Sequence, residues 1–229
     1  MVVTKSYTEP PICKKEILRY AGCKNSNQES LQFSAESRQL DELLHECLGE
    51  ILPKLSYKVC FMELPLAING TSCDFDCMKL ESKDLVKNLQ GCEKVILFAA
   101  TIGVEIDRFI MKYGAISPAK AMMFQAIGAE RIESLCDVFC AELESEGVSL
   151  RPRFSPGYGD LSIEMQKDIF QVLNCSKNIG ISLNDSLLMS PSKSVTAFAG
   201  VSMEASQEKR YNENKCAVCQ KIDCVYRGK

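Results

Sequence analysis

The chain has 229 residues, of which 46% are hydrophobic and 25% are charged, and its formal net charge is −3. This composition is that of a globular protein with a buried core, and it excludes disordered, collagen-like and coiled-coil chains. The mildly acidic balance also argues against a nucleic-acid-binding protein.

The first 150 residues alternate helical and strand-like patterns. Apolar residues at helical spacing predict a helix over 34–52, ended by Pro53. The other elements expected in this part are a β-rich segment over 57–68 ending at Asn69-Gly70, a helix capped by Ser82 and ending at Gly91, a buried strand over 94–100, a helix from Thr101 to Gly114, and a helix from Ser117-Pro118 to Glu146.

The pattern changes after Leu150. Residues 151–160 hold two Pro and two Gly and predict a defined loop. A helix capped by Ser162 and strands over 179–183 and 194–202 follow, and then a polar, charged stretch begins. This mixture predicts an α+β fold with one main domain over 1–203 and a cysteine-rich tail over 204–229.

Thirteen cysteines, one His and no Trp are the unusual counts. The N-terminus has no apolar stretch of signal-peptide length, and no apolar run reaches the ~20 residues that a bilayer span needs. We therefore expect a cytoplasmic protein without membrane segments, whose thiols stay reduced. The isolated cysteines are expected to be small buried residues: Cys13, Cys23, Cys47, Cys60, Cys92 and Cys175.

Two further cysteine pairs have ordinary structural interpretations. Cys136 and Cys140 are one helical turn apart among apolar residues, which indicates core packing. Cys73 and Cys77 flank a short loop, and Leu80 stands where a radical S-adenosylmethionine enzyme would need its third cysteine. That class of enzyme is therefore excluded.

The loop 151–160 carries the chemistry. Arg153 offers a planar fork that binds a carboxylate or phosphate through two hydrogen bonds. Gly157 and Gly159 allow a ligand to approach the backbone, and Tyr158 adds an aromatic face. S-Adenosylmethionine fits this set, because its carboxylate suits the arginine and its sulfonium suits an aromatic face. The alternative is a structural loop whose arginine pairs with a helix C-terminus.

Four landmarks in order resemble the activation domain of cobalamin-dependent methionine synthase. They are Arg153-Phe154-Ser155-Pro156-Gly157-Tyr158, a helix, Ile179-Gly180-Ile181-x-Leu183, and Met189-x-Pro191-x-x-Ser194-Val195-Thr196. The match spans roughly residues 150–202.

The resemblance implies a C-shaped α+β fold with a twisted antiparallel sheet that binds S-adenosylmethionine. Such a domain docks on the cobalamin domain of methionine synthase, where one electron from a flavodoxin-like donor and a methyl group restore the methylated cofactor. Arg153 would hold the ligand carboxylate, Ser155 and Gly157 would offer backbone contacts, and Tyr158 would face the ligand. Glu130 or Glu133 would receive the ligand amine.

Departures from the family pattern indicate a free-standing short form. Gly159-Asp160-Leu161 replaces Pro-Ala-Cys-Pro, and the family's second ligand tyrosine has no clear match, although Tyr211 is a candidate. The sequence lacks the Asp-x-His-x-x-Gly signature of a cobalamin-binding domain. We therefore expect an accessory activator of a partner methionine synthase, which carries the cobalamin.

Cys216, Cys219 and Cys224 form the remaining motif, spaced CxxCx4C in the polar tail. Three thiolates suit zinc or an iron–sulfur cluster, whereas the simpler interpretation is a tail with free thiols. A metal here leads to an alternative function, in which a redox protein passes electrons to a corrinoid protein through its tail.

Overall fold

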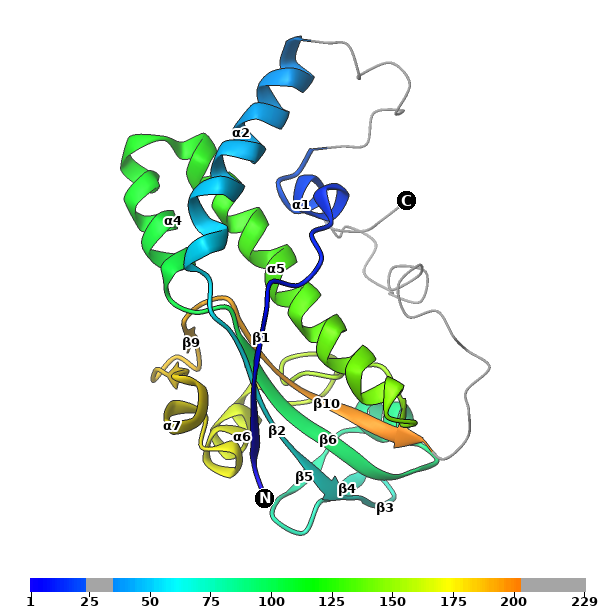
Figure 1. The fold of residues 1–229 in the computed structure, drawn as a ribbon. Coiled ribbons are helices and arrows are strands. Elements are labelled where there is room, and N and C mark those ends of the chain that lie inside the picture. Colours follow the sequence, from blue (N-terminus) through cyan, green and yellow to red (C-terminus); the bar gives the residue numbers. More distant parts are fainter. Residues whose placement is uncertain (24–34, 203–229) are drawn as a thin grey trace.

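The computed structural model describes residues 1–23 and 35–202 and shows an α+β fold around a twisted, curled antiparallel sheet (Figure 1). The helices are α1 (Lys14–Tyr20), α2 (Ala35–Ile51), α3 (Lys83–Leu89), α4 (Glu105–Ile116), α5 (Pro118–Ser145), α6 (Gln166–Leu173) and α7 (Cys175–Ile179), with 3₁₀ turns η1 (Leu52–Lys54) and η2 (Ile163–Met165). The strands are β1 (Val3–Tyr7), β2 (Tyr57–Pro65), β3 (Ala67–Asn69), β4 (Ser72–Asp74), β5 (Lys79–Glu81), β6 (Cys92–Thr101), β7 (Ser149–Leu150), β8 (Ser182–Leu183), β9 (Met189–Ser190) and β10 (Ser194–Ser202).

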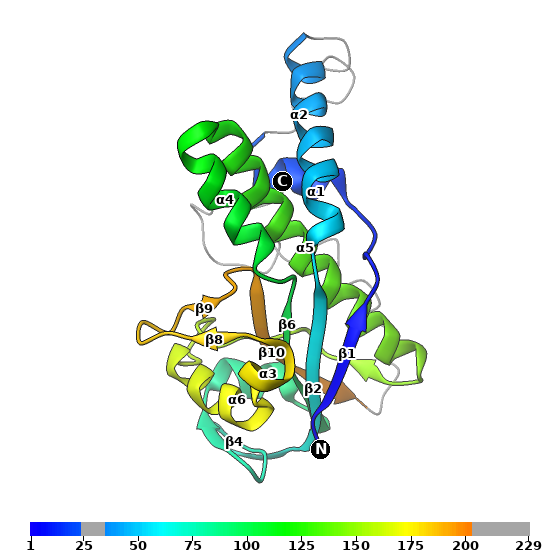
Figure 2. The ribbon, with the colours of Figure 1, turned by 60° about the vertical axis from the view of Figure 1, so that its left-hand side comes forward.

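The main sheet has five strands in the order β1-β2-β6-β10-β7, and all neighbours are antiparallel. β6 and β10 are the long central strands, and their pairing begins with Ser194 opposite Thr101. β3, β4 and β5 form a small second sheet, and β8 and β9 form a hairpin beside β10 (Figure 2). The fold class predicted from the sequence is confirmed.

The centre of the sheet is buried on both faces, so β6 is apolar from Val95 to Ala100. Its residues Ile96, Phe98 and Ala100 lie in the core formed with α1, α2, α4 and α5. Val95, Leu97 and Ala99 lie in a second core with α3, α6 and α7. Because side chains alternate along a strand, two buried faces produce a continuous apolar run in place of an alternating one.

Local signals explain the helices that flank the sheet. Ser82 accepts a hydrogen bond from Leu85 N–H at 3.0 Å and so caps α3. Pro118 is the first residue of α5, as predicted, since a helix does not use the N–H that proline lacks there. The long α5 crosses one face of the sheet (Figure 1), where Phe139 packs against Phe98 with ring centroids 5.0 Å apart.

Two predicted element boundaries were wrong. Thr101 does not begin a helix: it ends β6, and α4 starts only at Glu105, because Gly103 makes a turn with φ +85°. The strand predicted over 179–183 shrinks to Ser182–Leu183, since Ile179 ends α7 and Gly180 reverses the chain with φ +73°.

The cysteines largely behave as expected. Cys47, Cys60, Cys92 and Cys175 are buried free thiols, and so are Cys73 and Cys136. Cys13 is exposed, so its predicted burial was wrong, because it lies at the surface just before α1, and Cys23 is only partly buried. Within 1–23 and 35–202, no helix is long and apolar enough to cross a membrane.

Candidate functional site

A cavity of about 540 Å³ lies at the outer edge of β10. Next to β10, Arg151 N–H donates to the carbonyl of Gly200, and Phe154 and Phe198 exchange two backbone hydrogen bonds of 2.8 Å. Beyond Phe154 the chain turns away from β10. The cavity therefore opens beside Ser194–Thr196, with α5 on one side and α6 on the other.

Backbone hydrogen bonds hold the turn that forms the rim of the cavity. Gly157 N–H donates to the carbonyl of Leu161 at 2.9 Å, and Leu161 N–H donates to that of Tyr158 at 3.1 Å. Gly157 has φ +90°, a backbone conformation that favours glycine. Leu161 is buried, so the turn is fixed to the core, while Tyr158 stays 69% exposed at the rim.

Asp160 ties this turn to the start of α3. Its carboxylate accepts hydrogen bonds from the Ser82 hydroxyl and from the N–H groups of Lys83 and Asp84, and the Asp84 carboxylate accepts from Asp160 N–H at 3.2 Å. The Ser82 hydrogen bond lowers the pKa of Asp160. A negative charge at a helix N-terminus is favourable, so Gly159-Asp160-Leu161 holds the loop by polar contacts.

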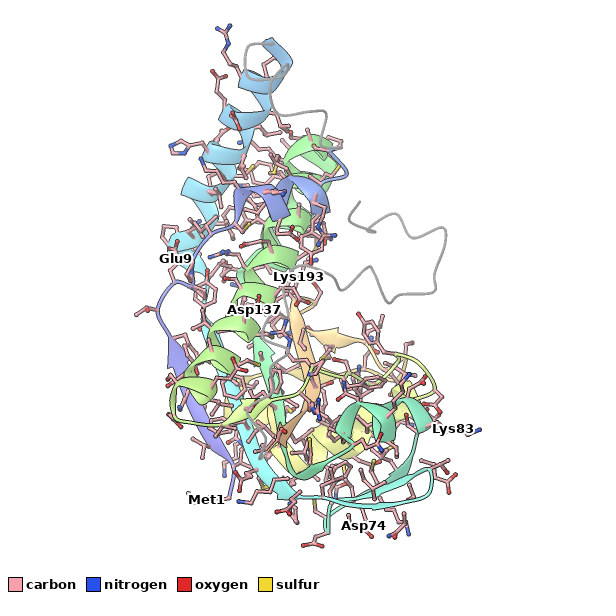
Figure 3. The ribbon with its side chains drawn as sticks, turned by 90° about the vertical axis from the view of Figure 1, so that its right-hand side faces the viewer. Met1, Glu9, Asp74, Lys83, Asp137 and Lys193 are labelled. Atoms are coloured by element: carbon pink, nitrogen blue, oxygen red, sulfur yellow. The ribbon has the colours of Figure 1, made fainter. Side chains whose placement is uncertain are left out.

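Arg153 lies in the cavity wall, where it is held by α5. Its guanidinium pairs with Glu133 at 2.9 Å and with Asp137 at 2.7 Å, and its side chain is 11% exposed. The i,i+4 spacing puts both carboxylates on one face of α5, on which Figure 3 labels Asp137. Burial opposes the charge, but Cys136, Asp137 and Glu133 outweigh it and raise the pKa of Arg153 above its ordinary value.

The structure distinguishes the two glutamates that were candidates for the ligand amine. Glu133 lines the cavity. Glu130 is 3% exposed and accepts hydrogen bonds from Cys13 N–H at 2.8 Å and from Arg131 at 2.6 Å, away from the cavity. Only Glu133 is therefore placed to meet a ligand.

Arg153, Ser155 and Tyr158 come together in the cavity wall, and Gly157 shapes the turn between them, while their predicted contact with a ligand stays a prediction. Sequence reasoning missed the residues that other elements contribute, namely Tyr20, Gln166, Met189 and Thr196. Tyr20 ends α1, and the Arg19 guanidinium lies 4.4 Å from its ring centroid. Met189 and Thr196 stand in the family-like landmark over 189–196, which was given no role in binding, whereas no motif marks Tyr20 or Gln166.

Cys216, Cys219, Cys224 and Tyr211 lie outside the described residues, so the predicted metal site and the second tyrosine stay predictions. The described residues contain no group of three or more potential metal ligands. The division into 1–203 and 204–229 also stays a prediction.

The structure is an α+β domain with a cavity of ligand size at the edge of β10. A family model described as the vitamin B12-dependent methionine synthase activation domain matches residues 76–223, more than half of the chain. The chain therefore belongs to the family of vitamin B12-dependent methionine synthase activation domains.

A solved structure supports the same fold. It is described as the MetH reactivation domain bound to AdoHcy (S-adenosylhomocysteine), and it is 14% identical with a TM-score of 0.64 over 87% of this chain and 78% of that chain. A comparison with curated proteins found no match.

Proposed function

We propose that this domain binds S-adenosylmethionine in the β10-edge cavity and presents its methyl group to the cobalamin of a partner methionine synthase. The observation that carries the proposal is the meeting of Arg153, Ser155 and Tyr158, the residues of the family-like loop, around one cavity that Glu133 also lines. The AdoHcy held by the structural neighbour supports the same ligand class.

The charges of the wall suit the ligand. Arg153 and Glu133 in the wall and Asp137, which pairs with Arg153 outside the lining, together carry one net negative charge, whereas S-adenosylmethionine carries one net positive charge. Arginine has five N–H donors, so Arg153 can bind a ligand carboxylate while Glu133 and Asp137 hold its orientation. Glu133 then receives the ligand ammonium.

The size and the opening of the cavity also suit the role. A volume of about 540 Å³ lies within the ~300–1,000 Å³ of ordinary ligand sites. Tyr158 at the rim is exposed and can contact both the ligand and a corrin ring brought by the partner. A docking protein can therefore reach the methyl group without any rearrangement of the core.

S-Adenosylmethionine would supply the methyl group as a sulfonium, and an electron from a flavodoxin-like donor would reduce the partner's cobalt so that it can accept it. The residues of this chain then bind and orient. Arg153 and Glu133 fix the amino-acid end, and Tyr158 stabilises the sulfonium side. Methyl transfer from a sulfonium needs no general base, so positioning is the whole contribution of the domain. The protein is thus an accessory component of the methyltransferase.

Titration calorimetry with S-adenosylmethionine tests this function. Arg153→Ala should weaken binding about tenfold to a hundredfold, because charge-assisted hydrogen bonds are lost. Arg151→Ala is the matched control, since Arg151 lies in the same segment but contacts Gln90 and not the cavity. Asp137→Asn should lower the preference for S-adenosylmethionine over S-adenosylhomocysteine, which lacks the sulfonium charge.

The partner reaction provides the second measurement. Reactivation of an oxidised cobalamin-dependent methionine synthase should require this protein together with the methyl donor and a reductant. Absence of ligand binding by the native protein, or full reactivation with Arg153→Ala, would refute the proposal.

The three tail cysteines offer a separate test of the alternative redox function. Metal analysis of the full chain and of Cys216→Ser decides whether zinc or iron is bound. Loss of iron together with loss of electron transfer would support the alternative, whereas full activity without residues 204–229 would exclude it.

A further inference from the structure

Two buried polar atoms in the cavity have no hydrogen-bond partner within the described chain. They are Gln166 Oε1 and Thr196 Oγ1, in side chains that are 5% and 2% exposed. Both residues line the cavity. Buried polar groups in native proteins are almost always hydrogen-bonded, because leaving one unpaired costs free energy. Such atoms at one site indicate that a ligand is their partner.

The fold brings these two side chains to the same place. Thr196 lies two residues before Phe198 on β10, so both side chains point to the same face of the sheet. Phe198 lies in the same core as Ile169 of α6, the helix whose first residue is Gln166. Gln166 and Thr196 therefore line the same cavity from two packed elements, α6 and β10.

The rim loop fixes the start of α6 as well. A Cβ on Gly157 would lie 3.2 Å from Cδ1 of Ile163 in η2, the turn that leads directly into α6. Ser162 caps this turn by accepting a hydrogen bond from Glu164 N–H. The position of Gln166 is thus coupled to that of the loop carrying Arg153.

The chemistry of the two atoms selects their partner. An amide oxygen only accepts hydrogen bonds, whereas a hydroxyl both donates and accepts. The 6-amino group of adenine is a donor that lies beside ring nitrogens that accept, and glutamine pairs with this edge in nucleic-acid recognition. With the amino-acid end of the ligand held by Arg153 and Glu133, the adenosine end is the part that remains for these atoms.

We propose that Gln166 and Thr196 select the adenine base: Gln166 Oε1 accepts from the 6-amino group, and Thr196 donates to a ring nitrogen. This inference rests on the proposed function, since it assumes that the ligand is an adenosyl compound. It adds two specificity-determining residues that lie outside the Arg153–Tyr158 loop.

The test compares two ligands by calorimetry: S-adenosylhomocysteine and its 6-deamino analogue, in which hydrogen replaces the amine. The native protein should prefer the amino compound by about tenfold to a hundredfold. Gln166→Met, which keeps the side-chain length, should abolish this preference. Thr196→Val should weaken both ligands equally and so keep the ratio. Ser72→Ala is the matched control, because Ser72 Oγ is also buried without a partner among the described residues but does not line the cavity.

Thermal unfolding without ligand supplies a second readout. Gln166→Met should raise the melting temperature, because it removes an unpaired buried oxygen, although it weakens binding. A purely structural glutamine would give the opposite sign. An unchanged ligand ratio in Gln166→Met would overturn this inference while leaving the proposed function intact, whereas no binding of either ligand by the native protein would overturn both.

Discussion

Replacing Arg131 by Met should make the protein much easier to unfold. The guanidinium is fully buried and donates to the carbonyls of Pro10 at 2.6 Å and Pro11 at 2.5 Å, and to both carboxylate oxygens of Glu130. Glu130 is 4% exposed in its side chain. The substitution leaves this carboxylate buried without its cation, and breaking such a pair costs about 3–5 kcal/mol.

The expected loss can be measured by urea unfolding followed by circular dichroism, since the chain has no Trp for fluorescence. At ~2–4 °C per kcal/mol for a chain of this size, the melting temperature should fall by roughly 6–20 °C. Adding Glu130→Gln to Arg131→Met removes the second charge and should recover a large part of the loss.

The result that refutes this reasoning is a loss below about 1 kcal/mol, or a double variant no more stable than the single one. Either result would mean that the Glu130–Arg131 pair does not hold the N-terminal segment on α5. The hydrogen bond from Cys13 N–H to Glu130 would then also contribute little to the stability of the protein.

Three further predictions follow from the site. Asp160→Asn should lower stability at pH 7. Because the pKa of Asp160 lies below its ordinary value of 3.8, the loss of stability should shrink as the pH falls below that value. A loss that does not depend on pH in urea unfolding would contradict this. Tyr20→Trp introduces a single Trp in the cavity wall, so its emission should change on ligand binding, while that of the exposed Met111→Trp should not; equal responses would place Tyr20 outside the site. Gly159→Ala should destabilise the rim and weaken binding, because its Cβ would lie 2.3 Å from Asp84 Oδ2 at φ +53°; unchanged melting and affinity would disprove the contact.

Local signals allowed much of the fold to be predicted. The helix start at Ser117-Pro118, the cap at Ser82 and the strand over 194–202 depend on neighbouring residues and were confirmed. The strand over 179–183 failed because Ile179 and Ile181 alternate like strand residues, yet both are buried by a helix end packed on the second core. Alternation of apolar residues indicates only which residues are buried, and here a helix end followed by a turn gives the same alternation as a strand.

The site was only half predictable for a related reason. Arg153 to Tyr158 are contiguous, so a motif can reveal them. Tyr20 and Thr196 are far apart in the sequence but both lie in the cavity wall, and only the packing of α1 and β10 brings them there. The ion pairs of Arg153 with α5 were equally invisible, because the sequence predicted α5 but not which face would meet the loop.

The position of β10 has a consequence for synthesis of the protein. This strand comes last along the described chain but lies between β6 and β7 in the sheet. During synthesis, roughly 100 more residues must therefore be added after β6 before β10 is available to pair with it. At ~5–20 residues per second, that wait lasts about 5–20 s. During it, the exposed edge of β6 is the segment most in need of a chaperone.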